Sequence, residues 1–60
     1  MNTQRAIEIS ASPVMADVTY QGESVYIQHV NEADGIARIY PLGHPQDERD
    51  VPASMLIERE

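Results

Sequence analysis

The N-terminal part of the chain has the spacing of a short amphipathic helix. Asn2 or Thr3 is a suitable capping residue, and apolar residues recur at three-residue spacing from Ala6 onward. Pro13 has no amide hydrogen and disfavours helical geometry at the residue before it, so it cannot continue the helix. The pattern predicts a helix over about residues 3–11. Because so short a helix is marginal in water, it must dock on the rest of the chain.

From residue 16 onward, apolar and polar residues alternate with the two-residue period of β-strands. Three segments show this period, at residues 16–20, 24–30 and 36–40. Gly22 supplies a tight turn after the first segment, since glycine adopts positive φ at little cost. The Asp34–Gly35 pair is a strong hairpin signal before the third. Together these features predict a three-stranded antiparallel meander.

The second predicted strand contains a conflict between its two faces. Val25 and Ile27 alternate onto one face, and a strict two-residue period places Val30 on the other. If Val30 also faces inward, a β-bulge near Gln28 and His29 is required. We therefore expect irregular strand pairing at this point if Val30 belongs to the core.

The remaining residues predict an exposed loop and a short closing segment. Residues 41–50 hold two prolines, one glycine and four charged residues, a composition typical of loops. A short strand around Arg49 to Val51 follows, and then a last turn or strand anchored by Leu56. The whole pattern predicts a single mainly β domain over residues 1–60. In it, a helix precedes a sheet over about residues 16–58 that closes into an SH3-like roll or barrel.

So short a chain has little core and no room for a deep active-site cleft. A domain of 60 residues buries only about 60% of the surface that its unfolded chain exposes, and this chain has no Phe or Trp. We therefore expect self-association that buries an exposed strand edge or the tyrosine-bearing face. The expected core residues are Ile9, Val18, Tyr20, Val25, Ile27, Val30, Ala37, Ile39, Val51 and Leu56.

Charge and cysteine content exclude several classes of function. Ten acidic residues against four arginines and no lysine give a net charge of -6, which disfavours binding to nucleic acid. The absence of cysteine excludes disulfides, thiolate metal sites and a thiol nucleophile, and it indicates a reducing compartment. No apolar run approaches the roughly 18 residues of a membrane span, and the first residues lack the apolar region of a secretory signal. We expect an intracellular protein with no membrane contact.

Residues that could carry out chemistry do not form a recognisable motif. His44 with Asp47, Glu48 and Asp50 is the one local cluster that could attempt to bind a metal, but it lacks the glycine and the spacing of an EF-hand loop. A solvated loop is the simpler interpretation. The four serines show no nucleophile elbow, and there is no glycine-rich phosphate loop. We expect no enzymatic activity, no cofactor, no metal and no small-molecule substrate.

Tyr26, Arg38 and Tyr40 form the most plausible ligand-binding face. Arg38 and Tyr40 share one face of a predicted strand and Tyr26 lies on its neighbour, so the tyrosines could stack on bases. The alternative is structural, with the tyrosines capping the core and the stem of Arg38 covering apolar surface. The negative net charge and the absence of lysine favour the structural alternative.

The order of segments along the chain resembles the H-type small acid-soluble spore proteins of endospore-forming bacteria. The similarity spans almost all sixty residues. It includes Arg5, Ala6, Glu8 and Ile9 in the helix, TYQG at 19–22, IQHV at 27–30, ARIYPL at 37–42 and the V-P-x-S-x-L closure at 51–56.

This resemblance implies a cellular context more than a chemistry. Proteins of this type are made in the forespore and deposited in the spore core, and they have no established catalytic motif from which site residues could be transferred. The DNA-coating spore proteins have a different sequence pattern, so their function is not transferred. The resemblance implies a non-enzymatic structural or storage protein. The alternative is a small binding module for nucleic acid or for another spore protein, the latter through an open sheet edge at residues 16–20 or at the terminal strand.

Overall fold

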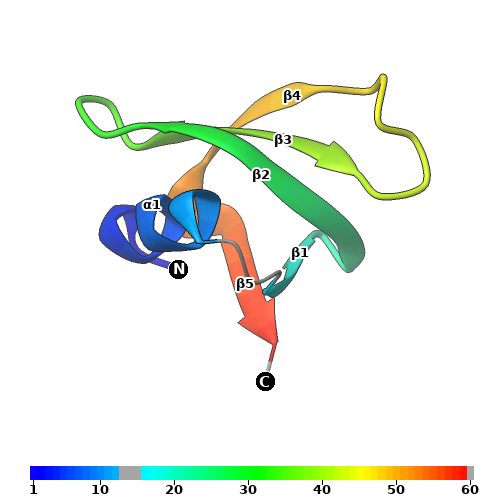
Figure 1. Ribbon diagram of the computed structural model, residues 1–60, viewed down its shortest axis with the longest axis horizontal. Coiled ribbons are helices and arrows are strands. Elements are labelled where there is room, and N and C mark those ends of the chain that lie inside the picture. Colours follow the sequence, from blue (N-terminus) through cyan, green and yellow to red (C-terminus); the bar gives the residue numbers. More distant parts are fainter. Residues whose placement is uncertain (13–15, 60) are drawn as a thin grey trace.

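The computed structural model describes residues 1–12 and 16–59, and in them one α-helix lies against a five-stranded antiparallel sheet (Figure 1). The helix covers the residues that the sequence predicts, but the role of Pro13 in ending it lies outside the described residues. In chain order the elements are α1 (Thr3–Ala11), β1 (Asp17–Tyr20), β2 (Glu23–Asn31), β3 (Ile36–Pro41), β4 (Arg49–Pro52), the 3₁₀ turn η1 (Ala53–Met55) and β5 (Leu56–Arg59).

The strand order is β4-β3-β2-β1-β5, and every neighbouring pair is antiparallel. This order confirms the meander and the mainly β fold with a helix in front of it. The prediction of a closed barrel needs correction, because β4 and β5 remain the two outer strands and do not pair with each other in the described residues. Each is only four residues long, and η1 carries the chain from one to the other.

The core lies between α1 and the inner face of the sheet. Eight of the expected core residues are buried, whereas Ile9 and Tyr20 are only partly buried. Ala6 and Ala53 are fully buried although they are not among the expected core residues. Ala6 lies where α1 packs against β2, and its short side chain lets the helix backbone approach the sheet closely. The buried residues of the hydrophobic core are Ala6, Val18, Val25, Ile27, Val30, Ala37, Ile39, Val51, Ala53 and Leu56.

The predicted irregularity in β2 is present. Ile27 pairs with Ile39, but the register shifts before His29, which pairs with Arg38. The shift turns Val30 inward, where its side chain is only 8% exposed. The bulge therefore resolves the conflict in the sequence and confirms the prediction.

Both hairpins depend on residues in the left-handed region. Gln21 and Gly22 form the two-residue turn between β1 and β2 with φ angles of 51° and 82°. The turn was predicted from Gly22, but a non-glycine residue also adopts positive φ here. In the second hairpin Gly35 has φ 70°; its amide donates to the carbonyl of Asn31 and its own carbonyl accepts from the amide of Ala53, both at 2.9 Å. Gly35 thus joins the loop after β2 to the start of η1.

Candidate functional site

Tyr26, Arg38 and Tyr40 do lie on one face of the sheet, on the side away from the core. Tyr26 on β2 is directly opposite Tyr40 on β3, with ring centroids 5.2 Å apart and ring planes inclined by 32°. Arg38 lies two residues before Tyr40 and therefore on the same face of β3. Tyr26 is 38% exposed and Tyr40 is partly buried. The structure brings the three residues together as the sequence predicts, and their role as a binding face stays a prediction.

The guanidinium of Arg38 is already occupied by two carboxylates from the neighbouring segment. Its Nε and Nη2 donate to the two carboxylate oxygens of Asp50 at 3.0 and 3.2 Å, and its Nη1 donates to Glu48 at 3.2 Å. These hydrogen bonds, first with Asp50 and then with Glu48, raise the pKa of Arg38. One cation thus faces two anions, so this group attracts a phosphate less than a free arginine would.

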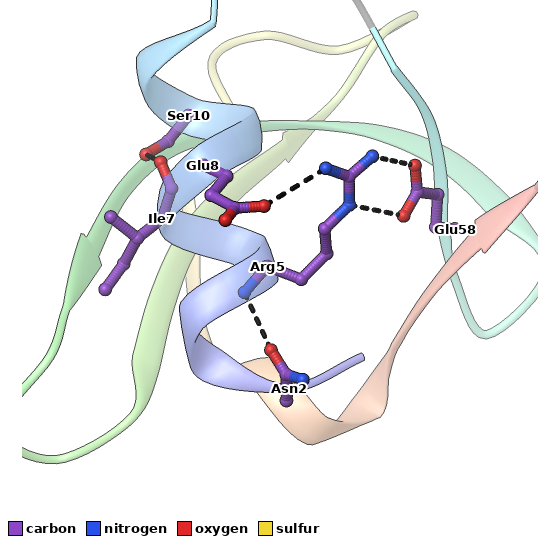
Figure 2. Close-up of polar contacts among 6 residues, drawn as sticks. All are labelled: Asn2, Arg5, Ile7, Glu8, Ser10 and Glu58. Atoms are coloured by element: carbon purple, nitrogen blue, oxygen red, sulfur yellow. Dashed lines mark hydrogen bonds and ion pairs between the residues drawn. The ribbon is translucent and has the colours of Figure 1, made fainter.

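A second arginine holds α1 to β5 (Figure 2). Arg5 donates from Nε and Nη2 to the two carboxylate oxygens of Glu58 at 2.8 and 2.6 Å, and from Nη1 to Glu8 at 3.2 Å. The hydrogen bond from Arg5 lowers the pKa of Glu58. The backbone amide of Arg5 also donates a hydrogen bond to the side-chain Oδ1 of Asn2 at 2.7 Å, and this hydrogen bond caps the helix. No local pattern in the sequence points to Glu58, because 53 residues separate it from Arg5.

A small polar hollow lies where the turn between β1 and β2 meets the start of β4. It has a volume of about 110 Å³ and is lined by Tyr20, Gln21, Glu23 and Arg49. Within the described residues Arg49 makes no salt bridge, unlike Arg5 and Arg38. No signal in the sequence joins these residues, because they meet only through the bending of the sheet.

The loop with His44 is exposed and held by its own backbone. The amide of His44 donates to the carbonyl of Pro41 at 3.0 Å, and its carbonyl accepts from the amide of Asp47 at 2.9 Å. Across residues 1–12 and 16–59, no three His, Asp or Glu side chains are placed to hold a metal ion. In the same part of the chain, no helix has the length and apolar character needed to cross a membrane.

Comparison with known proteins identifies the family. The family model described as "Small acid-soluble spore protein H family" matches residues 1–58. The chain belongs to the small acid-soluble spore protein H family. Relatives in this family are similar over nearly their whole length. The Small, acid-soluble spore protein H of Halalkalibacterium halodurans is 62% identical over 58 residues, which cover 97% of each chain.

Two further members of the spore protein H family show how far this similarity extends. The Small, acid-soluble spore protein H of Bacillus subtilis is 59% identical over 97% of this chain and 98% of its own. The Small, acid-soluble spore protein H 2 of Bacillus cytotoxicus is 51% identical over 98% of this chain and all of its own. No solved structure gives a significant match to the chain. The resemblance seen in the sequence is therefore confirmed at the level of the family.

Proposed function

We propose that this member of the spore protein H family is a non-enzymatic protein of the spore core, made in the forespore, with a structural or storage role. The observation that carries the proposal is the family match over residues 1–58. The proposal goes beyond that match in naming the compartment and the role. Both rest on the resemblance and on the physical properties of the chain.

The charge distribution supports a protein that stays dispersed in a concentrated interior. The chain has ten acidic residues and four arginines, and two of those arginines are each paired with two carboxylates. The acidic excess therefore remains on the surface, where it opposes aggregation. The chain also has no cysteine that could oxidise during long storage.

A storage role is supported by the small core. At about 0.05 to 0.15 kcal/mol per residue, a chain of this length has a free energy of unfolding of about 3 to 9 kcal/mol. The rate of proteolysis commonly follows the fraction of molecules that are unfolded. A domain with a small free energy of unfolding is therefore degraded readily once proteases become active. Such a protein can return its amino acids quickly when dormancy ends.

The compartment is tested by fractionating spores of a host that expresses a tagged copy of the chain. We expect the tag to appear in the forespore during sporulation and to be extracted from dormant spores only after rupture of the core. A cytosolic protein expressed from the same forespore promoter is the control. Recovery of the tagged chain in the coat or membrane fraction would contradict the proposed location.

The storage role is tested by following the tagged chain during germination. We expect its level to fall early, and a destabilised variant such as Gly35→Ala to disappear faster than the unchanged chain, because degradation should follow unfolding. Gly43→Ala, at a glycine with open space around it, is the matched control. A chain that persists through outgrowth would refute the storage role and leave the structural role standing.

The alternative of a nucleic-acid-binding module receives less support. It would use Tyr26, Arg38 and Tyr40, but Arg38 already shares its hydrogen-bond donors with Asp50 and Glu48. Of the two segments that could pair with a strand of another spore protein, residues 16–20 are unsuitable because β1, which they contain, already has a partner on each side. The terminal strand β5 is an outer strand and keeps that possibility.

A further inference from the structure

Asp34 and Gly35 form the place in this chain where the main chain is most prone to rearrange by its own chemistry. The side-chain carboxyl of an aspartate can close on the main-chain nitrogen of the next residue to give a five-membered succinimide ring. The reaction is fastest before glycine, because glycine has no side chain to hinder the approach. Of the four aspartates only Asp34 precedes a glycine; the others precede Val18, Glu48 and Val51. Asp34 is also exposed, so water reaches it.

The folded loop between β2 and β3 holds both reacting groups away from this reaction. The amide of Gly35 donates a hydrogen bond to the carbonyl of Asn31 at 2.9 Å. Oδ1 of Asp34 accepts a hydrogen bond from the amide of Ile36 at 3.1 Å. Ring closure requires the carboxyl carbon to approach the nitrogen of Gly35 from above the plane of its peptide group, and it requires the amide to lose its proton. Both hydrogen bonds oppose these steps, so the ring forms only in molecules in which they are broken.

The loop can break these hydrogen bonds while the strands stay paired. Residues 32–34 are exposed, and so is a further hydrogen bond of the loop, from the amide of Ala33 to Oδ1 of Asn31 at 3.0 Å. Exposed turns with few buried contacts open at a lower free energy than the whole domain. The fraction of molecules in which the turn is open therefore sets the rate of ring formation.

We propose that Asp34–Gly35 is a modification site at which the chain converts to isoaspartate, and that the native turn sets the rate of conversion. In the first step the nitrogen of Gly35 bonds to Cγ of Asp34, and water leaves with the hydroxyl of the protonated carboxyl and the amide proton. In the second step water adds to the main-chain carbonyl carbon of Asp34, and the bond from that carbon to the nitrogen of Gly35 breaks. The main chain then runs through Cγ, and the former carbonyl carbon carries a free carboxylate. The mass of the chain is unchanged.

The product lengthens the main chain by one carbon at a position that the fold holds closely. Gly35 has φ 70°, its amide donates to Asn31 and its carbonyl accepts from the amide of Ala53. A methyl group on Gly35 would lie 3.2 Å from Oγ1 of Thr3, so the start of α1 lies close to the loop. The added carbon displaces Gly35 from its hydrogen bonds, and the converted chain should be less stable than the original one.

The converted loop presents a group that the original chain lacks. Its free carboxylate is attached directly to Cα of residue 34, at a position that is exposed in the fold. An enzyme that transfers a methyl group from S-adenosylmethionine to isoaspartyl carboxylates would therefore accept the converted chain and not the original one, whichever compartment holds the protein.

The test is to incubate the full chain at neutral pH and to follow isoaspartate by this methyl transfer, with the modified residue located by fragmentation mass spectrometry. A peptide of residues 30–38 is the reference, because it contains the same reacting groups without the fold. We expect isoaspartate at residue 34 in both, formed at least about tenfold more slowly in the folded chain; a tenfold difference corresponds to an opening free energy of about 1.4 kcal/mol. Urea that unfolds the chain should raise its rate to that of the peptide.

Three results would overturn the proposal. They are equal rates in the folded chain and the peptide, first accumulation at another aspartate, and a folded chain that shows no isoaspartate when the same chain in urea has converted fully. The consequence for stability is checked on the converted fraction, whose unfolding midpoint in urea should be lower than that of the unconverted chain. An equal midpoint would contradict the expected loss of contacts at Gly35.

Variants separate the turn from the rest of the fold. Asp34→Glu keeps the charge but would need a six-membered ring, so methyl transfer at this position should disappear. Asn31→Ala removes the hydrogen bond to the amide of Ala33 and should speed conversion by about 2- to 12-fold, which corresponds to the loss of a hydrogen bond of about 0.5 to 1.5 kcal/mol. Ser10→Ala removes a side-chain hydrogen bond to the carbonyl of Ile7 in α1 and is the matched control, with no change in rate expected. Equal acceleration by Asn31→Ala and Ser10→Ala would show that global unfolding sets the rate, and it would refute the role of the turn.

Discussion

Enlarging Ala6 should destabilise the protein although it adds apolar surface to the helix. Ala6 is 0% exposed where α1 packs against β2. Leucine has nearly the same helix propensity as alanine, so the helix itself is little affected by Ala6→Leu. The added carbon atoms must be fitted into a closed contact, which costs about 1 to 3 kcal/mol. For a domain of this size each kcal/mol lowers Tm by about 4 to 8 °C, so we expect a drop of about 4 to 24 °C.

The assay is thermal and urea unfolding followed by circular dichroism, with an unchanged urea m-value showing that the unfolding transition itself is the same. Gln4→Leu is the matched control, because it makes a similar enlargement at an exposed position of the same helix and should change stability by no more than about 0.5 kcal/mol. If Ala6→Leu leaves Tm unchanged or raises it, α1 is not closely packed on the sheet and the reasoning fails.

Three further predictions concern a carboxylate, a turn and a helix cap. The hydrogen bond from Arg5 lowers the pKa of Glu58 from its usual 4.5. The contribution of the Glu58 carboxylate to the free energy of unfolding is therefore complete above about pH 4.5, and it is lost as the pH falls through the lowered pKa. Urea titrations should show that Glu58→Gln loses less stability than the unchanged chain below about pH 4.5. Gly35→Ala should cost about 1 kcal/mol or more in urea unfolding, since φ is 70° and the added methyl group would lie 3.2 Å from a hydroxyl oxygen, whereas Gly43→Ala should be neutral or stabilising. Asn2→Ala should cost about 1 kcal/mol by calorimetry, and an unchanged Tm would mean that the cap contributes nothing.

The sequence contains enough local information to predict most of the elements. The helix was predicted because a capping residue and a proline bracket it, and the first hairpin because Gly22 separates two alternating segments. Even the bulge in β2 follows from the need to turn Val30 inward while Val25 and Ile27 keep their places. In each case the decisive residues lie within a few positions of one another.

The sequence does not show which distant segments come into contact in the fold. The pairing of β1 with β5 sets Ile57 beside Thr19, and the salt bridge between Arg5 and Glu58 spans almost the whole chain. The composition of residues 41–50 predicts a loop that includes Leu42, yet Leu42 continues the register of β3. The curvature of the sheet decides which residues at its ends are buried. It also decides whether the outer strands meet, and here β4 and β5 remain apart although the pattern predicts closure.

The central position of β2 has a consequence for how the molecule opens. This strand pairs with β1 on one side and β3 on the other, and α1 packs against it (Figure 1). If β2 is lost, the pair β1–β5 and the pair β3–β4 lose their connection to each other, and α1 loses the strand against which it packs. Subglobal opening is therefore suppressed, and the protein behaves as one cooperative foldon. The slowest amide protons of α1, β2 and β3 should then exchange with deuterium at a common free energy, equal to that of global unfolding.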